Sequence, residues 1–466
     1  MDKLKRGSLA IFIGALLWFI PVPEGLKAEA WHLFAIFAAT IAGFILHPLP
    51  IGAIAFVSIT FTAAMGILSP GDILTGFSAT NMWLIISAFF FSRGLIKSGL
   101  GKRIAFLLIQ RFGNRTLKLG YILTISDLII APATPSNTAR GGGIVFPIAG
   151  SLSAAFGSQP GESAGRLGRY LMQIGYQANC ITSAMFMTAM SGNPVIAMLA
   201  LKAAGAELSW GLWALAAFVP GLLSLLIVPY FLYRIDPPEV THTPEAKEIA
   251  QAELAQMGPM TRIEKIVGLV FVGALLLWAS SSYTHVNATI TAMIAVSVML
   301  LTEVLTWQDI LNEKGAWDTF VWMGSLMALA NFLSKLGFIP WLAAVISSHM
   351  NGIAWLPSLL ILAVIYVYSH YGFASMVAHI VAMYAAFTAV AVAAGVPPYL
   401  AALSLAFLSS LCGSLTHYAA GPAPIFFGAG YVEQNIWWRH GFLISIINLL
   451  IWIGIGGAWW KIIGLW

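Results

Sequence analysis

The sequence predicts an all-α polytopic membrane protein with about 11 transmembrane helices plus two re-entrant hairpins in an inverted repeat. Of its 466 residues, 59% are hydrophobic and only 9% are charged, and the mean hydropathy is +0.86. Soluble domains carry about 25% charged residues, so this composition excludes an ordinary soluble fold. The apolar runs are continuous, whereas a transmembrane β-barrel shows alternating segments of about ten residues. Cys180 and Cys412 lie in apolar segments and are expected to act as small hydrophobes rather than to form a disulfide.

The first elements are long apolar runs with a basic start. Residues 8–22, 30–46, 51–68 and 441–460 approach or reach the roughly 20 residues that cross the hydrocarbon layer. No small-residue cleavage site precedes Pro21, so the first run is expected to remain as a span. Most lysines and arginines fall on the side of Lys3, Lys5 and Arg6, which predicts a cytoplasmic N-terminus. The net charge of +5 therefore faces the cytoplasm and anionic lipid, and it is no signal for nucleic acid.

The chain next reads as two similar halves. Residues 234–260 form the only long hydrophilic stretch, which is expected to be a partly helical, cytoplasmic linker. The paired landmarks on either side of it are Lys97 with Lys335, Ser136 with Ser375, and Gly192 with Gly421. The predicted crossings run in opposite directions in the two copies, and such inverted repeats are typical of secondary transporters.

Each half contains a polar motif between short apolar arms. The arms 119–130 and 144–156 are too short to span a bilayer comfortably, which favours a re-entrant hairpin over two spans. Residues 358–390 would form the second hairpin from the opposite face. Non-helical backbone at membrane depth is tolerated where it is buried in protein or lines a wet cavity. Residues 102–112 and 340–350 are amphipathic and are expected to lie flat at the two interfaces.

The tip of the first hairpin, PATPSNTARGGG, carries the strongest site signal. Its prolines stop the first arm, since residues before proline avoid the helical conformation. Ser136, Asn137 and Thr138 then stand where a second helix begins, beside unpaired backbone N–H groups that form a ready anion site. A capped turn would explain these residues too, but it does not explain Arg140 so near membrane depth. We therefore predict that Arg140 lines a substrate site, and we leave open whether Asp127 balances it or caps a helix.

The second tip offers Ser369, His370, Ser375 and His379. A lone histidine in an apolar span is more often a satisfied structural group than a ligand. His379, however, falls at the position that matches Arg140 in the first copy, which makes it the stronger candidate of the two histidines.

Two interrupted spans supply the remaining predicted walls. Such breaks free backbone groups near the midplane, where transporters bind their substrates. A purely structural kink is the alternative. The residues at the breaks are Ser191, Gly192, Asn193 and Pro194 in the first half and Gly421, Pro422, Ala423 and Pro424 in the second, with Thr188 and His417 at matching distances upstream.

Three stretches carry a family resemblance: PSNTARGGGIVFPIA, ITSAMFMTAMSGNPV and GSLTHYAAGPAPIFFGAGYVEQNIWWRHGF. With them, nearly the whole chain resembles the divalent anion:sodium symporter family. It is most similar to the exchanger branch, which contains plastid 2-oxoglutarate/malate translocators and bacterial citrate/succinate and tartrate/succinate antiporters. The resemblance implies a homodimer in the bacterial inner or plasma membrane that binds small carboxylate anions, uses no cofactor or resident metal and works by an elevator movement.

The resemblance also implies a division of the chain and a binding motif. Segments 1–116 and 262–355 would form the scaffold, segments 117–233 and 356–466 the moving transport domain, and 234–261 the linker. The family binds carboxylate through a Ser-Asn-Thr triplet at each tip. The first triplet is intact here, but Met376 and Val377 replace the amide and the hydroxyl of the second, which puts a sodium site there in doubt. The apolar pair would suit four- or five-carbon dianions.

These observations predict sodium-independent exchange. Arg140 can neither leave nor deprotonate, and an unpaired arginine at membrane depth costs about 2.5–3.5 kcal/mol. An empty carrier that holds such a charge would be roughly a hundredfold less populated in transit. A sodium-coupled dicarboxylate symporter is the main alternative. An ion channel and an intramembrane hydrolase, with Ser375 facing His379, are remote ones, since no oxyanion or metal constellation accompanies that pair.

Overall fold

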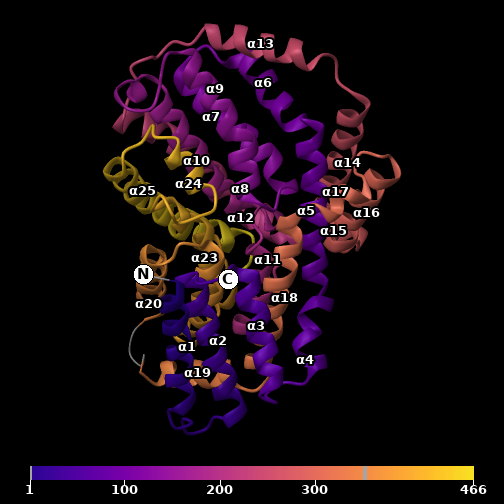
Figure 1. Cartoon of the computed structure of the whole chain (residues 1–466). Helices are drawn as coiled ribbons and strands as arrows, with labels where there is room; N and C mark the ends of the chain where they lie inside the picture. The colour runs from indigo at the N-terminus through magenta and orange to yellow at the C-terminus, as the bar shows by residue number, and fades with distance from the viewer. Residues whose placement is uncertain (1–2, 350–353) are drawn as a thin grey trace.

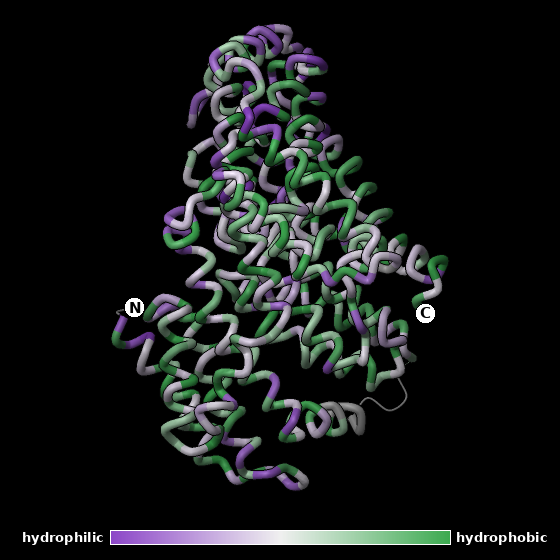
Figure 2. Tube along the Cα trace, turned by 90° about the vertical axis from the view of Figure 1, so that its right-hand side faces the viewer, coloured by the Kyte–Doolittle hydropathy of each residue, from purple (hydrophilic) through white to green (hydrophobic). Residues whose placement is uncertain are grey.

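The computed structural model describes residues 3–349 and 354–466, and within these ranges the chain is helical with no strands. The predicted all-α fold is therefore confirmed (Figure 1). Hydrophilic residues gather at the upper end of the molecule and at its lower tip, and hydrophobic residues dominate between them (Figure 2). Cys180 and Cys412 are both free and buried.

In the first half, a series of helices is followed by a helix–turn–helix around α8 and by a helix that is broken between α10 and α11. The elements are α1 (Lys3–Phe19), α2 (Ala28–Leu46), α3 (Ile51–Ala64), α4 (Pro70–Leu74), η1 (Thr75–Ser78), α5 (Thr80–Ser98), α6 (Leu100–Phe112), α7 (Thr116–Ile130), η2 (Ala131–Ala133), α8 (Asn137–Arg140), η3 (Gly141–Val145), α9 (Phe146–Ala155), η4 (Glu162–Arg166), α10 (Gly168–Met185), η5 (Met187–Ala189), α11 (Asn193–Ala204) and α12 (Trp210–Ile235).

The linker and the second half repeat this order. Helix α13 (Glu245–Met257) lies in the hydrophilic linker, so the expectation that the linker is partly helical is confirmed. The later elements are α14 (Arg262–Ala279), α15 (Ser281–Thr284), α16 (Ala288–Leu301), α17 (Trp307–Leu311), α18 (Lys314–Lys335), α19 (Phe338–His349), α20 (Trp355–Ser369), η6 (His370–Gly372), α21 (Met376–His379), η7 (Ile380–Tyr384), α22 (Ala385–Ala393), α23 (Pro398–Leu411), η8 (Cys412–Ser414), α24 (Ala423–Gly428), α25 (Gln434–Leu449), η9 (Leu450–Gly456) and α26 (Gly457–Ile462).

The number of membrane spans can be compared with the length and composition of these helices. Among the described residues, six helices are long and apolar enough to cross a membrane, or seven if the bent pair Pro70–Ser78 and Thr80–Ser98 forms one span. Four further apolar helices are shorter, among them Asn193–Ala204 and Pro398–Ser414. These two helices belong to the predicted interrupted spans. Each half of an interrupted span is shorter than the 18 residues required of one continuous spanning helix. The count of about 11 stays a prediction.

The hairpin arms are longer than the sequence led us to expect. The first arm runs through α7 and η2 over 18 residues, Thr116–Ala133, and is long enough to cross a membrane. The helix starts three residues earlier than the apolar run, and the turn η2 extends it past the end of α7. Arm length therefore does not identify a re-entrant hairpin. Figure 1 does show α7 and α9 rising from α8 toward the same end of the molecule, as the two arms of a hairpin do.

Close packing of backbone joins the first and second halves. Helix α18 packs against α3, η1 and α5, and α5 packs against α16. A Cβ placed on Gly76 would run into the carbonyl oxygen of Gly324, so only glycine lets η1 approach α18 this closely. A second set of contacts joins α10 with α7, α12 and α23, and α11 with α22 and α23. The two predicted interfacial helices coincide with α6 and α19, although Met350, the last residue of the second, lies outside the described residues.

A buried ion pair fastens the linker to the first half. Arg103 on α6 pairs with Glu264 at the start of α14, with 2.5 Å between Nε and Oε1, and the two side chains are 9% and 2% exposed. The same guanidinium donates to the carbonyl oxygens of Gly258, at 2.9 Å, and Met257, at 3.4 Å. Glu264 also closes a capping box with Thr261. One arginine on α6 thus holds both the end of α13 and the start of α14.

Replacing Glu264 with glutamine is expected to lower stability by about 3–5 kcal/mol, because it leaves Arg103 buried without its counter-charge. Thermal unfolding of the purified protein in detergent measures the loss. A double variant with Arg103→Met and Glu264→Leu removes both charges and is expected to recover much of it. If Glu264→Gln unfolds at the temperature of the unmodified protein, the pair carries no stability.

Candidate functional site

The two hairpin tips have the same local structure. In each, a short 3-10 turn (η2 or η6) ends the first arm, a serine caps the next helix, and one helical turn leads into a five-residue π-helical segment (η3 or η7). Ser136 accepts a hydrogen bond from the Ala139 N–H at 3.1 Å, and Ser375 accepts one from the Ala378 N–H at 3.3 Å. The helix start predicted at Ser136 is capped by that serine, and the second tip has the same cap at Ser375.

Arg140 ends that helical turn in the first tip and lies in a cage of oxygen atoms. It is fully buried, and its Nε donates to Asp127 Oδ1 at 2.9 Å. Its remaining N–H groups donate to five further oxygens: the carbonyls of Thr134 (3.0 Å), Ala189 (2.9 Å) and Asn179 (3.4 Å) and the hydroxyls of Thr182 (3.1 Å) and Ser183 (3.0 Å). Asp127 is the only anion among these six partners.

This geometry corrects the role expected for Arg140. The sequence argument needs an unpaired charge in the empty carrier, but Asp127 balances the guanidinium within the protein. Thr182 also donates to Asp127, as does the side chain of Asn179 at 3.3 Å. The question left open for Asp127 is answered in favour of the ion pair. In this conformation Arg140 stabilises the tip from its buried side, because its N–H groups donate to protein oxygens.

His379 takes the matching place in the second tip, and its surroundings are less polar. It is fully buried, with Nε2 3.1 Å from Ser369 Oγ and Nδ1 3.8 Å from Cys412 Sγ. The rings of Tyr366 and His370 lie 4.4 and 4.9 Å away, centroid to centroid. Like Arg140, it stands behind the tip rather than at its surface.

The interrupted spans hold the two tips. Asn193 is fully buried and donates to the carbonyls of Ser183 (2.7 Å) and Phe186 (2.9 Å), which the break in the helix frees. Thr188 donates to the Pro132 carbonyl and accepts from Trp210 Nε1, so it ties the break to the first hairpin. Asn193 and Thr188 are therefore structural in this conformation, as the alternative interpretation of a kink had allowed.

The second break lies directly against the first tip. A Cβ on Gly421 would overlap Thr138 Oγ1, and one on Gly141 would lie 3.3 Å from Pro422 Cβ. Gly421 is exposed, whereas Pro422 and Ala423 are buried. The absence of a side chain at Gly421 lets the hydroxyl of the first tip reach this strip of backbone.

The candidate residues thus separate into two layers. The front layer keeps accessible surface: Ser136, Thr138, Ser375, Val377, His417 and Gly421 are half-buried or exposed. Asn137 is 8% exposed, and its side-chain Nδ2 has no protein partner. The back layer is buried and holds the front in place; it comprises Arg140, Thr188, Asn193, Pro194, Met376, His379, Pro422 and Ala423.

Several polar groups that the sequence argument did not select belong to the same region. Asn179, Thr182 and Ser183 share one face of α10 and supply oxygens to Arg140. Their spacing of three and four residues places them on one helix face, and this spacing is the feature of the sequence that could have identified them. Unpartnered buried atoms, each a side-chain donor or acceptor left without a protein hydrogen bond, also occur on Gln173, Gln177, Ser414 and Thr416.

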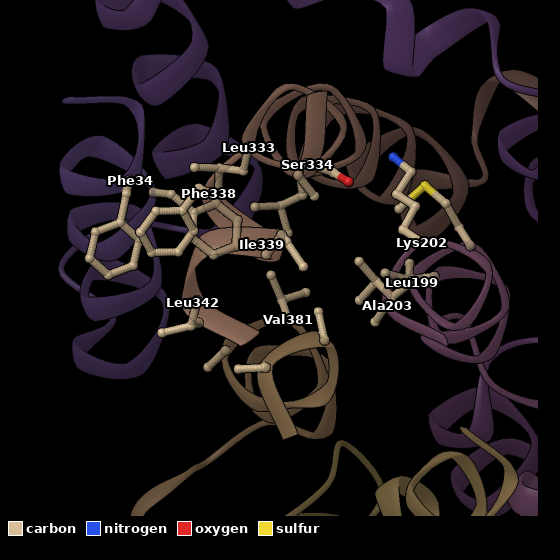
Figure 3. A pocket seen from close by; sticks show the side chains of 18 residues that line it. Phe34, Leu199, Lys202, Ala203, Leu333, Ser334, Phe338, Ile339, Leu342 and Val381 are labelled. Carbon is tan, nitrogen blue, oxygen red and sulfur yellow. The ribbon is translucent and has the colours of Figure 1, made fainter. Parts of the chain in front are cut away.

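A separate apolar cavity lies between α2, α11, α18, α19 and the segment η7–α22 of the second hairpin (Figure 3). Its lining includes Phe34 from α2, Leu333 from α18 and Val381 from η7, and it contains none of the predicted site residues. Among the described residues that line it, Lys202 is the only charged one, and its ammonium donates to Asn331. The cavity lies between segments that were assigned to the scaffold and segments that were assigned to the transport domain.

Comparison with known proteins gives one family and a group of relatives. The family described as sodium:sulfate symporter transmembrane region matches residues 1–466. YflS of Bacillus subtilis, provisionally named a malate transporter, is 53% identical over 465 residues, covering 100% of this chain and 97% of YflS. Dicarboxylate transporter 1 of Arabidopsis thaliana chloroplasts is 47% identical, covering 99% of this chain and 84% of that protein. The Escherichia coli inner membrane protein YbhI is 40% identical, covering 100% and 98%.

A solved structure agrees at the level of the fold. The crystal structure of the YdaH transporter of Alcanivorax borkumensis superposes with a TM-score of 0.55, covering 99% of this chain and 97% of that one. At 12% sequence identity, this likeness concerns the fold alone.

Proposed function

The chain belongs to the sodium:sulfate symporter family, and from that premise we propose that it exchanges dicarboxylates across the membrane without sodium. Family membership makes it an integral membrane transporter and not an enzyme, as the sequence analysis predicted. The intramembrane hydrolase considered there is excluded with it.

The substrate proposal rests on the relatives and on the front layer. Relatives up to 53% identical are named for malate or dicarboxylate transport, so C4–C5 dicarboxylates such as malate, succinate, fumarate and 2-oxoglutarate are the proposed substrates. Ser136, Asn137 and Thr138 offer side-chain donors at a capped helix start, where a carboxylate is favoured. Ser375 and His417 would receive the other end of the substrate.

The observation that carries sodium independence is the filled cage around Arg140. Carboxylate, carbonyl and hydroxyl oxygens are the ligands that hard cations take from proteins. Here six such oxygens are already engaged by a guanidinium that is part of the chain. A sodium ion has no place in this cage unless the arginine leaves it. The tethered cation thus replaces a mobile one, although Asp127 balances its charge.

Exchange, as opposed to one-way release, is supported by the unpartnered amide of Asn137. A buried donor without an acceptor costs about 1–3 kcal/mol, and a bound carboxylate would supply that acceptor. Without substrate, the Asn137 donor would stay unpaired while the tip moves through an apolar environment. This cost replaces the unpaired Arg140 charge as the reason why the loaded carrier would move more readily than the empty one.

The elevator movement and the homodimer belong to the same proposal. An apolar cavity with a single lysine separates segments 1–116 and 262–355 from segments 117–233 and 356–466 (Figure 3). Few specific polar contacts would need to break if the second set moved past the first. The bacterial relatives support a location in the plasma membrane, with the N-terminus in the cytoplasm.

Transport into proteoliposomes tests the proposal. Vesicles preloaded with unlabelled malate or succinate in sodium-free buffer are expected to take up labelled dicarboxylate, and empty vesicles are not. Adding sodium should change neither result. Because one dianion replaces another, an imposed membrane potential should have no effect on the rate. Sodium-dependent uptake into empty vesicles would instead establish the sodium-coupled symporter.

A further inference from the structure

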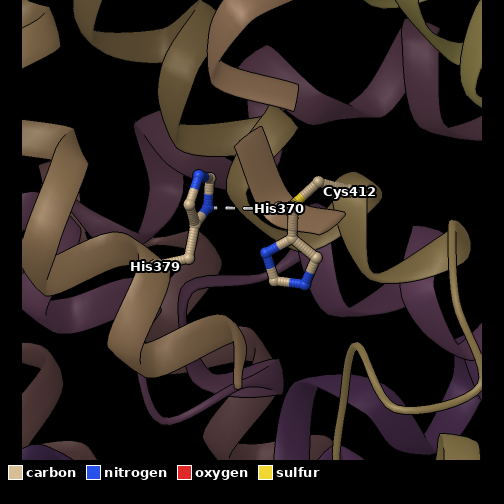
Figure 4. A group of neighbouring side chains, drawn as sticks. All are labelled: His370, His379 and Cys412. Carbon is tan, nitrogen blue, oxygen red and sulfur yellow. Dashed lines mark hydrogen bonds between the residues drawn. The ribbon is translucent and has the colours of Figure 1, made fainter. Parts of the chain in front are cut away.

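Two histidines and a cysteine converge behind the second hairpin tip. His370 ends the first arm, His379 lies on the second, and Cys412 opens the break in the adjacent span (Figure 4). All three are fully buried, and one nitrogen of each histidine and the sulfur lie within 4.8 Å of one another. Nothing in the transport proposal uses this cluster.

The hydrogen bonds around the cluster leave lone pairs toward its centre. His370 Nε2 lies 3.0 Å from the Ala419 carbonyl oxygen and must donate to it, so its Nδ1 is left unprotonated in the neutral ring. That Nδ1 is buried and has no partner. Ser369 donates to the Tyr366 carbonyl at 2.8 Å, so it accepts from His379 Nε2, which leaves His379 Nδ1 unprotonated as well. A backbone carbonyl or hydroxyl behind each imidazole is the usual support of a metal ligand.

Comparison of the two halves shows that the cluster is a changed copy of the Arg140 cage. When the two halves are aligned so that Ser136 matches Ser375, Asp127 matches Tyr366. The carboxylate that pairs with Arg140 in the first half therefore has no counterpart in the second half. The pairing that matches Gly192 with Gly421 puts Cys412 in the place of Ser183, so a thiol replaces a hydroxyl. The oxygen cage around Arg140 in the first half therefore corresponds in sequence to a nitrogen and sulfur cluster in the second.

We propose that His370, His379 and Cys412 bind one soft metal ion, and that Cu⁺ fits better than Zn²⁺. Imidazole and thiolate ligands select copper and zinc over magnesium or calcium. Binding would release the thiol proton to solvent and form two metal–nitrogen bonds and one metal–sulfur bond. Cu⁺ with one thiolate and two neutral imidazoles is uncharged, whereas Zn²⁺ would leave one uncompensated positive charge in a buried site without a carboxylate, which burial disfavours.

The geometry requires only a small adjustment. With bond lengths of about 2.0–2.1 Å to nitrogen and about 2.3 Å to sulfur, bound ligand atoms stand roughly 3.3–4 Å apart, so the widest separation must close by about 1 Å. Side-chain rotation of this size is ordinary. Gly372 and Ala374, in the segment between His370 and α21, are exposed, so the cluster lies close in sequence to the surface.

Metal retention by purified protein tests the site. Tag-free protein in detergent is incubated without oxygen with Cu⁺, or separately with Zn²⁺, desalted, and analysed by elemental mass spectrometry. About one Cu⁺ per chain is expected to remain. Cys412→Ser should abolish retention, and Cys180→Ser, which alters the other buried cysteine, should leave it unchanged. Equal retention by Cys412→Ser, or none by the unmodified protein, would overturn the site, and retention of Zn²⁺ but not Cu⁺ would overturn the choice of ion.

Two further measurements keep the metal proposal testable if the Cys412→Ser variant misfolds or if the protein does not transport dicarboxylates. Co²⁺ bound by the unmodified protein should show a thiolate charge-transfer band in the near ultraviolet, and its absence would rule out Cys412 as a ligand whether or not Cys412→Ser folds. If the proposed function holds, bound Cu⁺ would join both hairpin arms to η8 and slow exchange until a chelator is added. An inactive transporter that still retains Cu⁺ would contradict the transport proposal alone.

Discussion

Replacing Arg140 with alanine is expected to abolish sodium-free transport and to make the stability of the protein depend on sodium. The substitution removes the partner of a fully buried carboxylate, which costs about 3–5 kcal/mol. It also empties a cage that presents Asp127 together with carbonyl and hydroxyl oxygens. A small hard cation could then take the position of the guanidinium.

Thermal unfolding in detergent measures this effect. The Arg140→Ala variant should unfold at a higher temperature in sodium chloride than in choline chloride, since a ligand at 100 times its dissociation constant adds about 2.7 kcal/mol. The unmodified protein should show no difference between the two salts. The double variant Asp127→Asn/Arg140→Ala lacks the carboxylate and should lose the response. An Arg140→Ala variant that is equally stable in both salts would show that the cage is not a cation site.

The local features of the tips could be predicted from the sequence. At the first tip, proline before a serine, followed by an amide and a hydroxyl, predicts a helix end and a capped helix start, and Ser136 does cap a helix. Ser375 caps a helix as well, although no proline, amide or hydroxyl flanks it. These features depend on residues within one or two turns of each other. The repeat could be recognised for the same reason, because the local order of turn, cap and π-helical segment recurs in both halves.

The partners of Arg140 could not be predicted in this way. Asp127 lies on the preceding arm, and apart from the nearby Thr134 carbonyl the other oxygens come from α10 and η5, which approach the tip only in the folded chain. Two interpretations of Asp127 stayed open because a charge in an apolar run signals a partner without identifying it. The proximity of Cys412 to His370 and His379 could not be predicted for the same reason. Its apolar neighbours in the sequence suggested a packing residue.

Replacing Asn137 with alanine is expected to weaken dicarboxylate exchange strongly while leaving stability nearly unchanged. Its Nδ2 has no protein partner, so the substitution breaks no hydrogen bond in the described structure and removes a buried unsatisfied donor. A hydrogen bond to a charged group contributes about 1.5–3 kcal/mol, so its loss should raise the KM for exchange by roughly ten- to a hundredfold. Ser136→Ala, by contrast, loses the bond to the Ala139 N–H and should lower stability by about 1 kcal/mol.

Asn448 provides the matched control for this separation of function from stability. It is 2% exposed, lies on α25, outside both tip sequences, and neither its Nδ2 nor its Oδ1 is bonded to a described protein group. Asn448→Ala therefore removes a comparable buried amide and should leave both stability and exchange close to those of the unmodified protein. If Asn137→Ala exchanges dicarboxylate with an unchanged KM, the first tip does not hold the carboxylate. The unpartnered amide would then no longer penalise the empty carrier, and the physical reason for exchange would have to lie elsewhere in the fold.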